Sequence, residues 1–362
     1  MASVTITDVA KRAGVSMKTV SRVLNAEPHV SEELRERVLA AAKDMRYRPK
    51  VSARSLAGAR SYLVGFLLTT QHLEQEAVTY LVQAEIGALR ACRAAGYHLL
   101  AEAVDMLSDD LRAEVEGLAH GLAVDGLILL PPLCDHPILL SELDSAGIGY
   151  VRIAPATDPG RSPHVEADDV GAARIMTDHL LDLGHRRIGF IKGLKAHAAS
   201  ERRLEGFRSA LAARGVAVAE ELIFPGAFDF KSGYETTDAL LAGAEPPTAI
   251  FASNDLMAFG VMARAQELGR RVPEDLSVAG FDDSPPAGMM RPGLTTMRQP
   301  ISEMGAIAAE LIIGRAGKSE DAAPGRQHDL ACELMVRGST APPGAPAARP
   351  SPAGGTPSRT RR

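Results

Sequence analysis

From Tyr62 onward the chain alternates short apolar segments with longer amphipathic ones, and this alternation restricts the fold more than any other feature. Apolar segments of strand length lie at 62–68, 97–104, 125–130, 148–153, 187–192, 248–252 and 276–281. Amphipathic segments with helical spacing separate most of them, among them 80–95, 168–183, 201–214 and 255–268. Strands that alternate with helices form parallel sheets covered on both faces. Because about 270 residues exceed the usual size of one such sheet, we expect two α/β lobes with a cleft between them.

Three shorter helical patterns precede this region, within residues 5–47. The first spans about 6–13 with Thr5 as its N-cap and ends at Gly14, and the second follows the cap residue Ser16 and ends near residue 25. The third follows Ser31, and its three- and four-residue spacing predicts one buried face formed by Leu34, Val38, Leu39, Ala42 and Met45. Two helices joined by a turn as short as 13–15 are typical of a helix-turn-helix.

Charge is distributed unevenly along the chain. Residues 1–60 contain 12 Lys/Arg and 6 Asp/Glu, whereas residues 61–340 contain 24 and 39. The formal net charge of −5 therefore combines a basic N-terminal part with an acidic remainder. This division is expected when one domain contacts phosphate and the other does not.

The second helix of a helix-turn-helix enters the major groove, and residues near its N-terminus reach the base edges. Here these residues are Met17 and Lys18, followed one turn later by Arg22. Lys and Arg donate to guanine, whereas Met17 could make only apolar contact, for example with a thymine methyl. Short polar side chains around them are expected to contact phosphates, namely Ser16, Thr19, Ser21 and Asn25. The alternative is an ordinary surface helix with two scattered cations.

Three segments resemble the headpiece of the lac repressor and purine repressor family: TITDVAKRAGVSMKTVSRVLN, VSEELRERVLAAAKDMRYRP and ARSLAG. The resemblance extends over nearly all of residues 4–340. It implies that residues 51–58 fold into a hinge helix on DNA, and that paired hinge helices of a dimer enter the minor groove. Leu56 stands at the position of the leucine that is inserted between base pairs, which kinks the duplex. The alternative for Leu56 is a linker residue that rests on the body.

The same resemblance implies a body like that of the periplasmic sugar-binding proteins, with two lobes, three chain crossings and a ligand in the cleft. The segments that carry it are GHRRIGFIKG, ASERRLEGF, FASNDLMAFG, VAGFDDSP and LTTMRQP. Polar residues at the carboxyl ends of parallel strands point into such a cleft. Carried over residue by residue, the resemblance assigns effector contacts to Arg152, Arg203, Phe228, Asn254, Asp282 and Gln299.

Several positions depart from the family pattern. Arg152 stands where a family member has an acidic ligand contact, and Phe228 where it has a tryptophan. Position 199 is alanine instead of a hydroxyl residue, and the 69–81 loop is acidic and longer than expected. Asp, Asn and Arg side chains suit a sugar, but these departures leave the ligand's identity open. Asn254 would also cap the following helix, and Arg203 could instead pair with an acid on its own helix.

The sequence also bears on two other classes of protein, enzymes and periplasmic binding proteins. GRAGKS at 314–319 lacks the first glycine of a phosphate loop, because Ile312 stands there, and it follows a helix rather than a strand. HExxH, GxSxG and CxxC motifs are absent, and the histidines show no metal spacing, so we expect no catalysis, cofactor or metal. The polar N-terminus and three distant cysteines favour a cytoplasmic regulator that does not enter a membrane over a periplasmic protein.

We therefore predict an N-terminal all-α helix-turn-helix headpiece plus an α/β two-lobed, periplasmic-binding-protein-like sensor domain. Residues 1–50 would bind DNA, 51–60 form the hinge, 61–340 provide effector binding and dimerisation, and 341–362 form a disordered tail. The tail lacks heptad leucines, which favours a homodimer. We expect a sequence-specific repressor of a palindromic operator controlled by a small molecule, with carbohydrate the favoured class. Whether that molecule acts as inducer or corepressor, or a partner protein acts instead, stays open.

Overall fold

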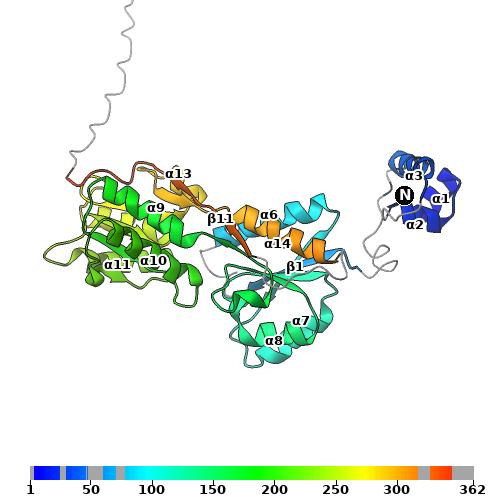
Figure 1. Ribbon diagram of the computed structural model, residues 1–362, viewed down its shortest axis with the longest axis horizontal. Helices are drawn as coiled ribbons and strands as arrows, with labels where there is room; N and C mark the ends of the chain where they lie inside the picture. Colours follow the sequence, from blue (N-terminus) through cyan, green and yellow to red (C-terminus); the bar gives the residue numbers. More distant parts are fainter. Residues whose placement is uncertain are drawn as a thin grey trace, which may run out of the picture.

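The computed structural model describes residues 4–24, 30–45, 47, 60–70, 78–316 and 327–344. Within these residues it contains a three-helix headpiece and a body of two α/β lobes (Figure 1). The predicted fold class is therefore confirmed. Three predicted features lie outside the described residues: the hinge up to residue 59, which includes Leu56, most of the acidic loop at 71–77, and the tail from residue 345.

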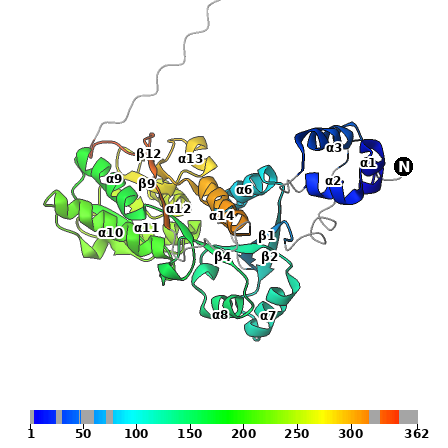
Figure 2. The same ribbon diagram turned by 45° about the vertical axis from the view of Figure 1, so that its right-hand side comes forward.

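The headpiece packs three helices against one another (Figure 2), around a small apolar core. They are α1 (Ile6–Ala13), α2 (Met17–Leu24) and α3 (Glu32–Asp44). All three contribute buried side chains to the core: Val9, Ala10, Ala13, Val20, Val23, Val38, Ala41 and Ala42. Leu39 does not belong to this buried face, since it is 47% exposed. It follows Val38 by about 100° of helix rotation, so it points outward when Val38 points into the core.

The helix ends of the headpiece follow from local sequence. The Thr5 hydroxyl accepts a hydrogen bond from the Asp8 amide, and the Asp8 carboxylate accepts one from the Thr5 amide over 2.8 Å, a reciprocal cap. Gly14 ends α1 with a φ of 66°, which glycine adopts without strain. The Ser16 hydroxyl accepts from the Thr19 amide over 3.1 Å at the start of α2. These caps confirm the predicted beginnings of α1 and α2.

The N-terminal lobe contains a parallel six-stranded sheet in the order β11-β5-β4-β3-β1-β2. Its strands are β1 (Leu63–Thr69), β2 (His98–Val104), β3 (Gly126–Leu129), β4 (Tyr150–Ile153), β5 (His164–Ala167) and β11 (Gln327–Leu330). Helices α6 (Val78–Ala94) and α14 (Ile301–Ala316) cover one face, and α7 (Leu111–Gly121) and α8 (Pro137–Ser145) cover the other. Both layers are visible in Figure 2.

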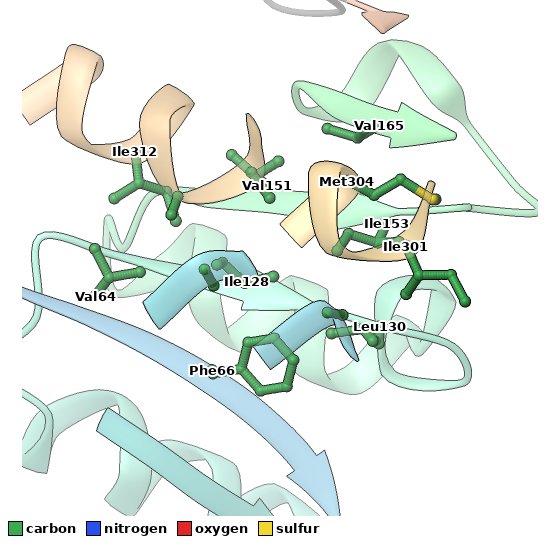
Figure 3. Packing of buried hydrophobic residues seen from close by; sticks show 14 of the residues in the cluster. Val64, Phe66, Ile128, Leu130, Val151, Ile153, Val165, Ile301, Met304 and Ile312 are labelled. Carbon is green, nitrogen blue, oxygen red and sulfur yellow. The ribbon is translucent and has the colours of Figure 1, made fainter. Parts of the chain in front are cut away.

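Helix α14 packs against the sheet through apolar side chains (Figure 3). Ile301, Met304 and Ile312 belong to one buried cluster with Val64, Phe66, Ile128, Leu130, Val151, Ile153 and Val165 of the sheet region. On its other side α14 approaches α6 at two glycines. A Cβ added at Gly87 would overlap with the carbonyl oxygen of Ser302, and one added at Gly305 with that of Ala84. The two helices therefore cross at backbone contact.

The C-terminal lobe contains a second six-stranded sheet in the order β12-β10-β9-β8-β6-β7, parallel except for β12. Its strands are β6 (Ile188–Ile191), β7 (Ile223–Phe224), β8 (Ala249–Ala252), β9 (Ser277–Asp282), β10 (Thr295–Arg298) and β12 (Glu333–Met335). One face is covered by α9 (Asp169–Asp182) and α10 (Ala198–Ala213), and the other by α11 (Phe230–Leu241), α12 (Asp255–Glu267) and α13 (Pro285–Met289). Short 3-10 helices are η1 (Leu133–Asp135), η2 (Pro159–Arg161) and η3 (Glu220–Leu222).

Three chain crossings connect the lobes, between β5 and α9, β10 and α14, and β11 and β12. This number agrees with the implied body architecture. Every strand and helix that the apolar pattern predicted is present, with ends within three residues of those expected. Strands β5, β7, β10, β11 and β12 were not among the predicted ones. β7 has only two residues, and the other four contain polar side chains that interrupt the apolar pattern, unlike the equally short β3, β6 and β8.

The chain is held to the C-terminal lobe beyond its last strand. The carbonyl oxygen of Ala341 lies 3.0 Å from His185 Nε2 and accepts a hydrogen bond from Ser277 over 3.1 Å. This contact lies just past residue 340, after which the predicted tail begins. Among the described residues, no helix is both long and apolar enough to cross a bilayer. The three cysteines are unpaired.

Candidate functional site

Helix α2 presents an outward face at the end of the headpiece turn. Met17 is 53% exposed and Lys18 is exposed in its first turn, while Arg22 is half-buried one turn later. Val20 and Val23 of the same helix are buried in the headpiece core. The core therefore fixes which face of α2 is turned outward, and the three residues predicted to read bases do not belong to the buried face.

The residues predicted to contact phosphate lie around this face. The hydroxyls of Ser16 and Thr19 lie 2.9 Å apart within hydrogen-bond distance, and Ser16 also caps α2, while Ser21 is half-buried. Asn25 lies outside the described residues. These polar side chains therefore lie beside the exposed first turn of α2.

A cavity of about 340 Å³ lies between the two lobes of the body. Five of the six predicted effector residues line it, namely Arg203, Phe228, Asn254, Asp282 and Gln299. All five belong to the C-terminal lobe. Side chains of the N-terminal lobe form the opposite wall: Thr69, Thr79, Tyr80, Leu81, Met106, Leu107, Pro131, Pro132, Ala154, Ala167 and Met304.

Arg203 provides the positive charge of the cavity wall. It projects from α10, and its Nε donates to Asp169 Oδ1 over 2.7 Å, at the N-terminus of α9. It also donates to the carbonyl oxygen of Ser253 and lies over the ring of Phe281, 3.6 Å from the ring centroid. The acid that pairs with Arg203 thus comes from another helix and not from its own. This buried guanidinium is held from three sides.

Two further carboxyls stand beside this ion pair. Asp282 ends β9 with a φ of 121° and accepts a hydrogen bond from Gln299 Nε2 over 2.6 Å. Burial raises the pKa of Asp282 to about 8, against the lowering effect of the charge of Arg203. Burial likewise raises the pKa of Asp255 to about 6, although Ser284 and Thr296 donate hydrogen bonds to it. The cavity floor can therefore accept and donate hydrogen bonds at neutral pH.

Asn254 joins two elements of the cavity wall. Its Oδ1 accepts from the Met257 amide over 3.0 Å, so it caps α12 as predicted, and its Nδ2 donates to the Phe228 carbonyl oxygen over 2.8 Å. Phe228 has a φ of 62°, and its ring lies 5.6 Å from the ring of His197 between centroids. Asn254 thereby fixes the backbone that presents the Phe228 ring to the cavity.

Arg152 does not line the cavity, which corrects its assignment as an effector contact. Its side chain is fully buried, and its Nε donates to the hydroxyl of Ser162 over 3.0 Å. One Nη donates to the Thr157 carbonyl oxygen over 2.8 Å and lies 3.7 Å from a carboxylate oxygen of Asp135. The other donates to the carbonyl of Asp158. With its donors directed to the loop after β4, Arg152 holds that loop in place.

Several cavity residues were not assigned from the sequence. Asp169 was missed because it follows β5, a strand that the apolar pattern did not predict. Tyr80 lines the cavity half-buried, and burial raises the pKa of its hydroxyl. Asp283, which follows Asp282, forms ion pairs with Arg298 and Arg337. Among the described residues, no group of three or more His, Cys, Asp or Glu could hold a metal ion.

Comparison with known proteins places both parts of the chain. Residues 5–50 match the family described as bacterial regulatory proteins, lacI family, and residues 177–340 match a periplasmic binding protein-like domain. The regulator CelR of Thermobifida fusca is 35% identical over 338 residues, 92% of this chain and 98% of that protein. The ribose operon repressor of Escherichia coli strain K12 is 32% identical over 337 residues, 92% of this chain and 99% of that one.

Solved structures of other proteins are also similar to this chain. The complex of CelR with cellobiose aligns over 93% of this chain and 99% of its own, with a TM-score of 0.71 and 32% identity. The lac repressor dimer bound to operator and the anti-inducer ONPF aligns over 94% of this chain and 100% of its own, with a TM-score of 0.72 and 27% identity. A regulator from Enterococcus faecium with bound ribose has a TM-score of 0.68 and 26% identity over 77% of this chain.

Proposed function

The chain belongs to the lacI family of bacterial regulatory proteins, and from this premise we propose that it is a repressor whose operator binding is controlled by a sugar held between its lobes. The observation that carries this proposal is the coexistence of an exposed α2 face on a basic headpiece with an inter-lobe cavity in the body that Arg203, Asn254, Asp282 and Gln299 line. Solved structures similar to this chain include a regulator in complex with cellobiose and one with bound ribose.

For DNA recognition, we propose that Lys18 and Arg22 donate to base edges while Met17 makes apolar contact. Ser16, Thr19, Ser21 and Asn25 would contact phosphates and fix the register of α2. Leu56 would act as the minor-groove wedge, and we expect Leu56→Ala to lower operator affinity at least about tenfold, since the inserted side chain stabilises the kink. Unchanged affinity of this variant would exclude the wedge.

For the effector, Arg203, Asp282, Asn254 and Gln299 offer donors and acceptors on one wall of the cavity, and Phe228 offers an aromatic ring. This set suits a polyol, because vicinal hydroxyls pair with carboxylate, amide and guanidinium groups while the ring covers an apolar sugar face. The volume of about 340 Å³ suits a ligand of one or two sugar rings.

We further propose that two copies form a dimer on a palindromic operator. Val82, Ile86 and Leu89 are 40%, 38% and 49% exposed along α6, at spacings of four and three residues. Such a stripe lies on one side of a helix and gives an apolar surface for a second copy. We place the regulator in the cytoplasm, where DNA is present and unpaired cysteines persist, and we propose no catalytic role for it.

The proposal is tested with the full-length protein in two steps. Selection from random-sequence DNA is expected to recover a palindrome, with half-sites about one helical turn or more apart. Calorimetric screening of sugars and sugar phosphates is then expected to find one that binds and changes operator affinity. Recovery of no specific DNA sequence would refute the regulator, whereas DNA binding without a response to any sugar would refute only the effector class.

A further inference from the structure

Two consecutive arginines at the start of α10 point to different lobes. Arg203 donates to Asp169 and Ser253 within the C-terminal lobe, where α10 itself belongs. Arg202 reaches instead to the N-terminal lobe. The neighbouring residues Ala198 and Ala199 line the effector cavity together with Arg203. The first turns of α10 therefore contact the effector cavity on one side and the N-terminal lobe on the opposite side.

Arg202 holds two separate elements of the N-terminal lobe. Its Nη1 lies 2.6 Å from Glu166 Oε2 on β5, and its Nη2 donates to the carbonyl oxygen of Pro155 after β4 over 3.4 Å. The second carboxylate oxygen of Glu166 accepts from Gln327 Nε2 on β11 over 3.0 Å. Glu166 is thus held by a hydrogen bond within its own sheet as well as by Arg202.

This contact differs from an ordinary surface ion pair, which contributes little because both side chains are free and solvated. The side chain of Glu166 is only 12% exposed and that of Arg202 29%. By contrast, Arg208 and Glu220 form an ion pair of the same length, 2.6 Å, whose side chains are 44% and 63% exposed. That pair joins α10 to η3 inside the C-terminal lobe and does not cross between lobes.

Helix α10 moves as a part of the C-terminal lobe. It packs along α9, where Gly206 allows backbone contact with the carbonyl of Val170, and Arg203 ties its first turns to Asp169. A ligand that draws Arg203 or the Ala198–Ala199 turn toward itself therefore also displaces Arg202. Since Glu166 lies two residues before the crossing into α9, the displacement acts at this crossing between the lobes.

We infer that Arg202 is a positioning residue: through Glu166 and Pro155 it couples the occupancy of the cavity to the orientation of the N-terminal lobe. The inference rests on the proposed function, because the N-terminal lobe follows the hinge segment that leads to the DNA-binding headpiece. The contact thereby restrains the orientation of the N-terminal lobe relative to the C-terminal lobe.

Hydrogen exchange of the full-length protein tests the contact without DNA or effector. We expect Arg202→Met and Glu166→Gln to raise exchange in peptides covering 153–167 and 327–330 at least about threefold, since local opening controls exchange there. The matched control Arg208→Met, on the same helix, should leave these peptides unchanged. The charge exchange Glu166→Arg with Arg202→Glu should restore only part of the protection, because it keeps the ion pair and loses the hydrogen bonds to Pro155 and from Gln327. Equal exchange in Arg202→Met and Arg208→Met, or a rise spread over the β8 and β9 peptides, would overturn the inference.

Operator binding tests the coupling itself, on DNA selected by the wild-type protein. Arg202→Met is expected to change operator affinity about fivefold and Arg208→Met to leave it unchanged, since a loosened lobe shifts the populations of its orientations. Altered exchange with unaltered operator affinity would overturn the coupling. If the wild-type protein selects no DNA, the proposed function fails, while the exchange experiment still decides the inter-lobe contact.

Discussion

Arg203 and Asp169 form a buried ion pair, 2.7 Å between Nε and Oδ1, with side chains only 4% and 3% exposed. The pair joins the first turns of α10 and α9 at the wall of the inter-lobe cavity. Asp282 and Asp255 stand nearby, and the charge of Arg203 acts against the rise of the Asp282 pKa. The charge of Arg203 thus acts on both Asp169 and Asp282.

Replacing this cation should destabilise the protein strongly. Arg203→Met leaves Asp169 buried without its partner, and we expect a loss of about 3–5 kcal/mol in the free energy of unfolding. Arg208→Met, which breaks the exposed pair with Glu220 on the same helix, should cost less than about 1 kcal/mol. Urea unfolding of the two variants measures the difference. Similar losses in both variants would mean that the buried pair contributes no more to the free energy of unfolding than the exposed pair does.

Stability should also depend on pH through Asp282. Its pKa is about 8 in the folded protein, above the ordinary value of 3.8, so the folded state binds this proton more tightly than the unfolded state does. The resulting stability is full below about pH 4, declines as pH rises and is lost above about pH 8. Asp282→Asn removes this decline. We therefore expect the melting temperature of Asp282→Asn, relative to wild type, to rise by about 2–4 °C or more between pH 5 and pH 8. A constant difference across this range would contradict the burial of Asp282.

The crossing of α6 and α14 predicts an intolerant glycine. Gly87→Ala would force its Cβ into the carbonyl of Ser302, so α6 and α14 must move apart and the N-terminal lobe should lose at least about 2 kcal/mol. Gly117 on α7 has no atom within 4 Å of an added Cβ. Gly117→Ala should be neutral or stabilising by about 0.5–1 kcal/mol, because alanine favours helix. Thermal unfolding of both variants checks this; a tolerated Gly87→Ala would place the two helices further apart.

The exposed first turn of α2 predicts a selective effect on DNA binding. Lys18→Ala should weaken binding to the selected operator about tenfold and reduce discrimination against substituted half-sites, as expected for a base-edge donor. Lys43→Ala removes an equal charge from the last turn of α3, where Lys43 is exposed. It should change binding less than about threefold. Fluorescence anisotropy at fixed salt compares the two, and equal losses would reduce Lys18 to a general electrostatic role.

The sequence predicted most of the architecture, for identifiable reasons. Strands such as β1 and β9 are six or seven residues long and nearly continuous in apolar side chains, whereas β5 and β10 are four residues long and contain polar ones. Without β5, the role of Asp169 and the contact of Glu166 with Arg202 could not be predicted, because both depend on where the chain crosses between lobes.

The direction of side chains was a second property that could not be predicted from the sequence. Arg152 lies on β4 among apolar residues, so the sequence indicated that it needs a partner but not on which side. Its donors turn to Ser162 and to carbonyls of the following loop, away from the cavity. Leu39 shows the same limit in the headpiece, since helical spacing alone did not define the edge of the buried face.

The most direct test of the account measures operator affinity with and without the sugar that calorimetry identifies, in wild type and in Gln299→Leu. Gln299 donates to Asp282 on the cavity wall and belongs to neither the headpiece nor the Arg203 pair. The account predicts that saturating sugar changes wild-type operator affinity at least about tenfold, and that Gln299→Leu binds operator normally but responds only at much higher sugar concentration. Sugar that binds the wild-type protein and leaves its operator affinity unchanged would contradict the central claim.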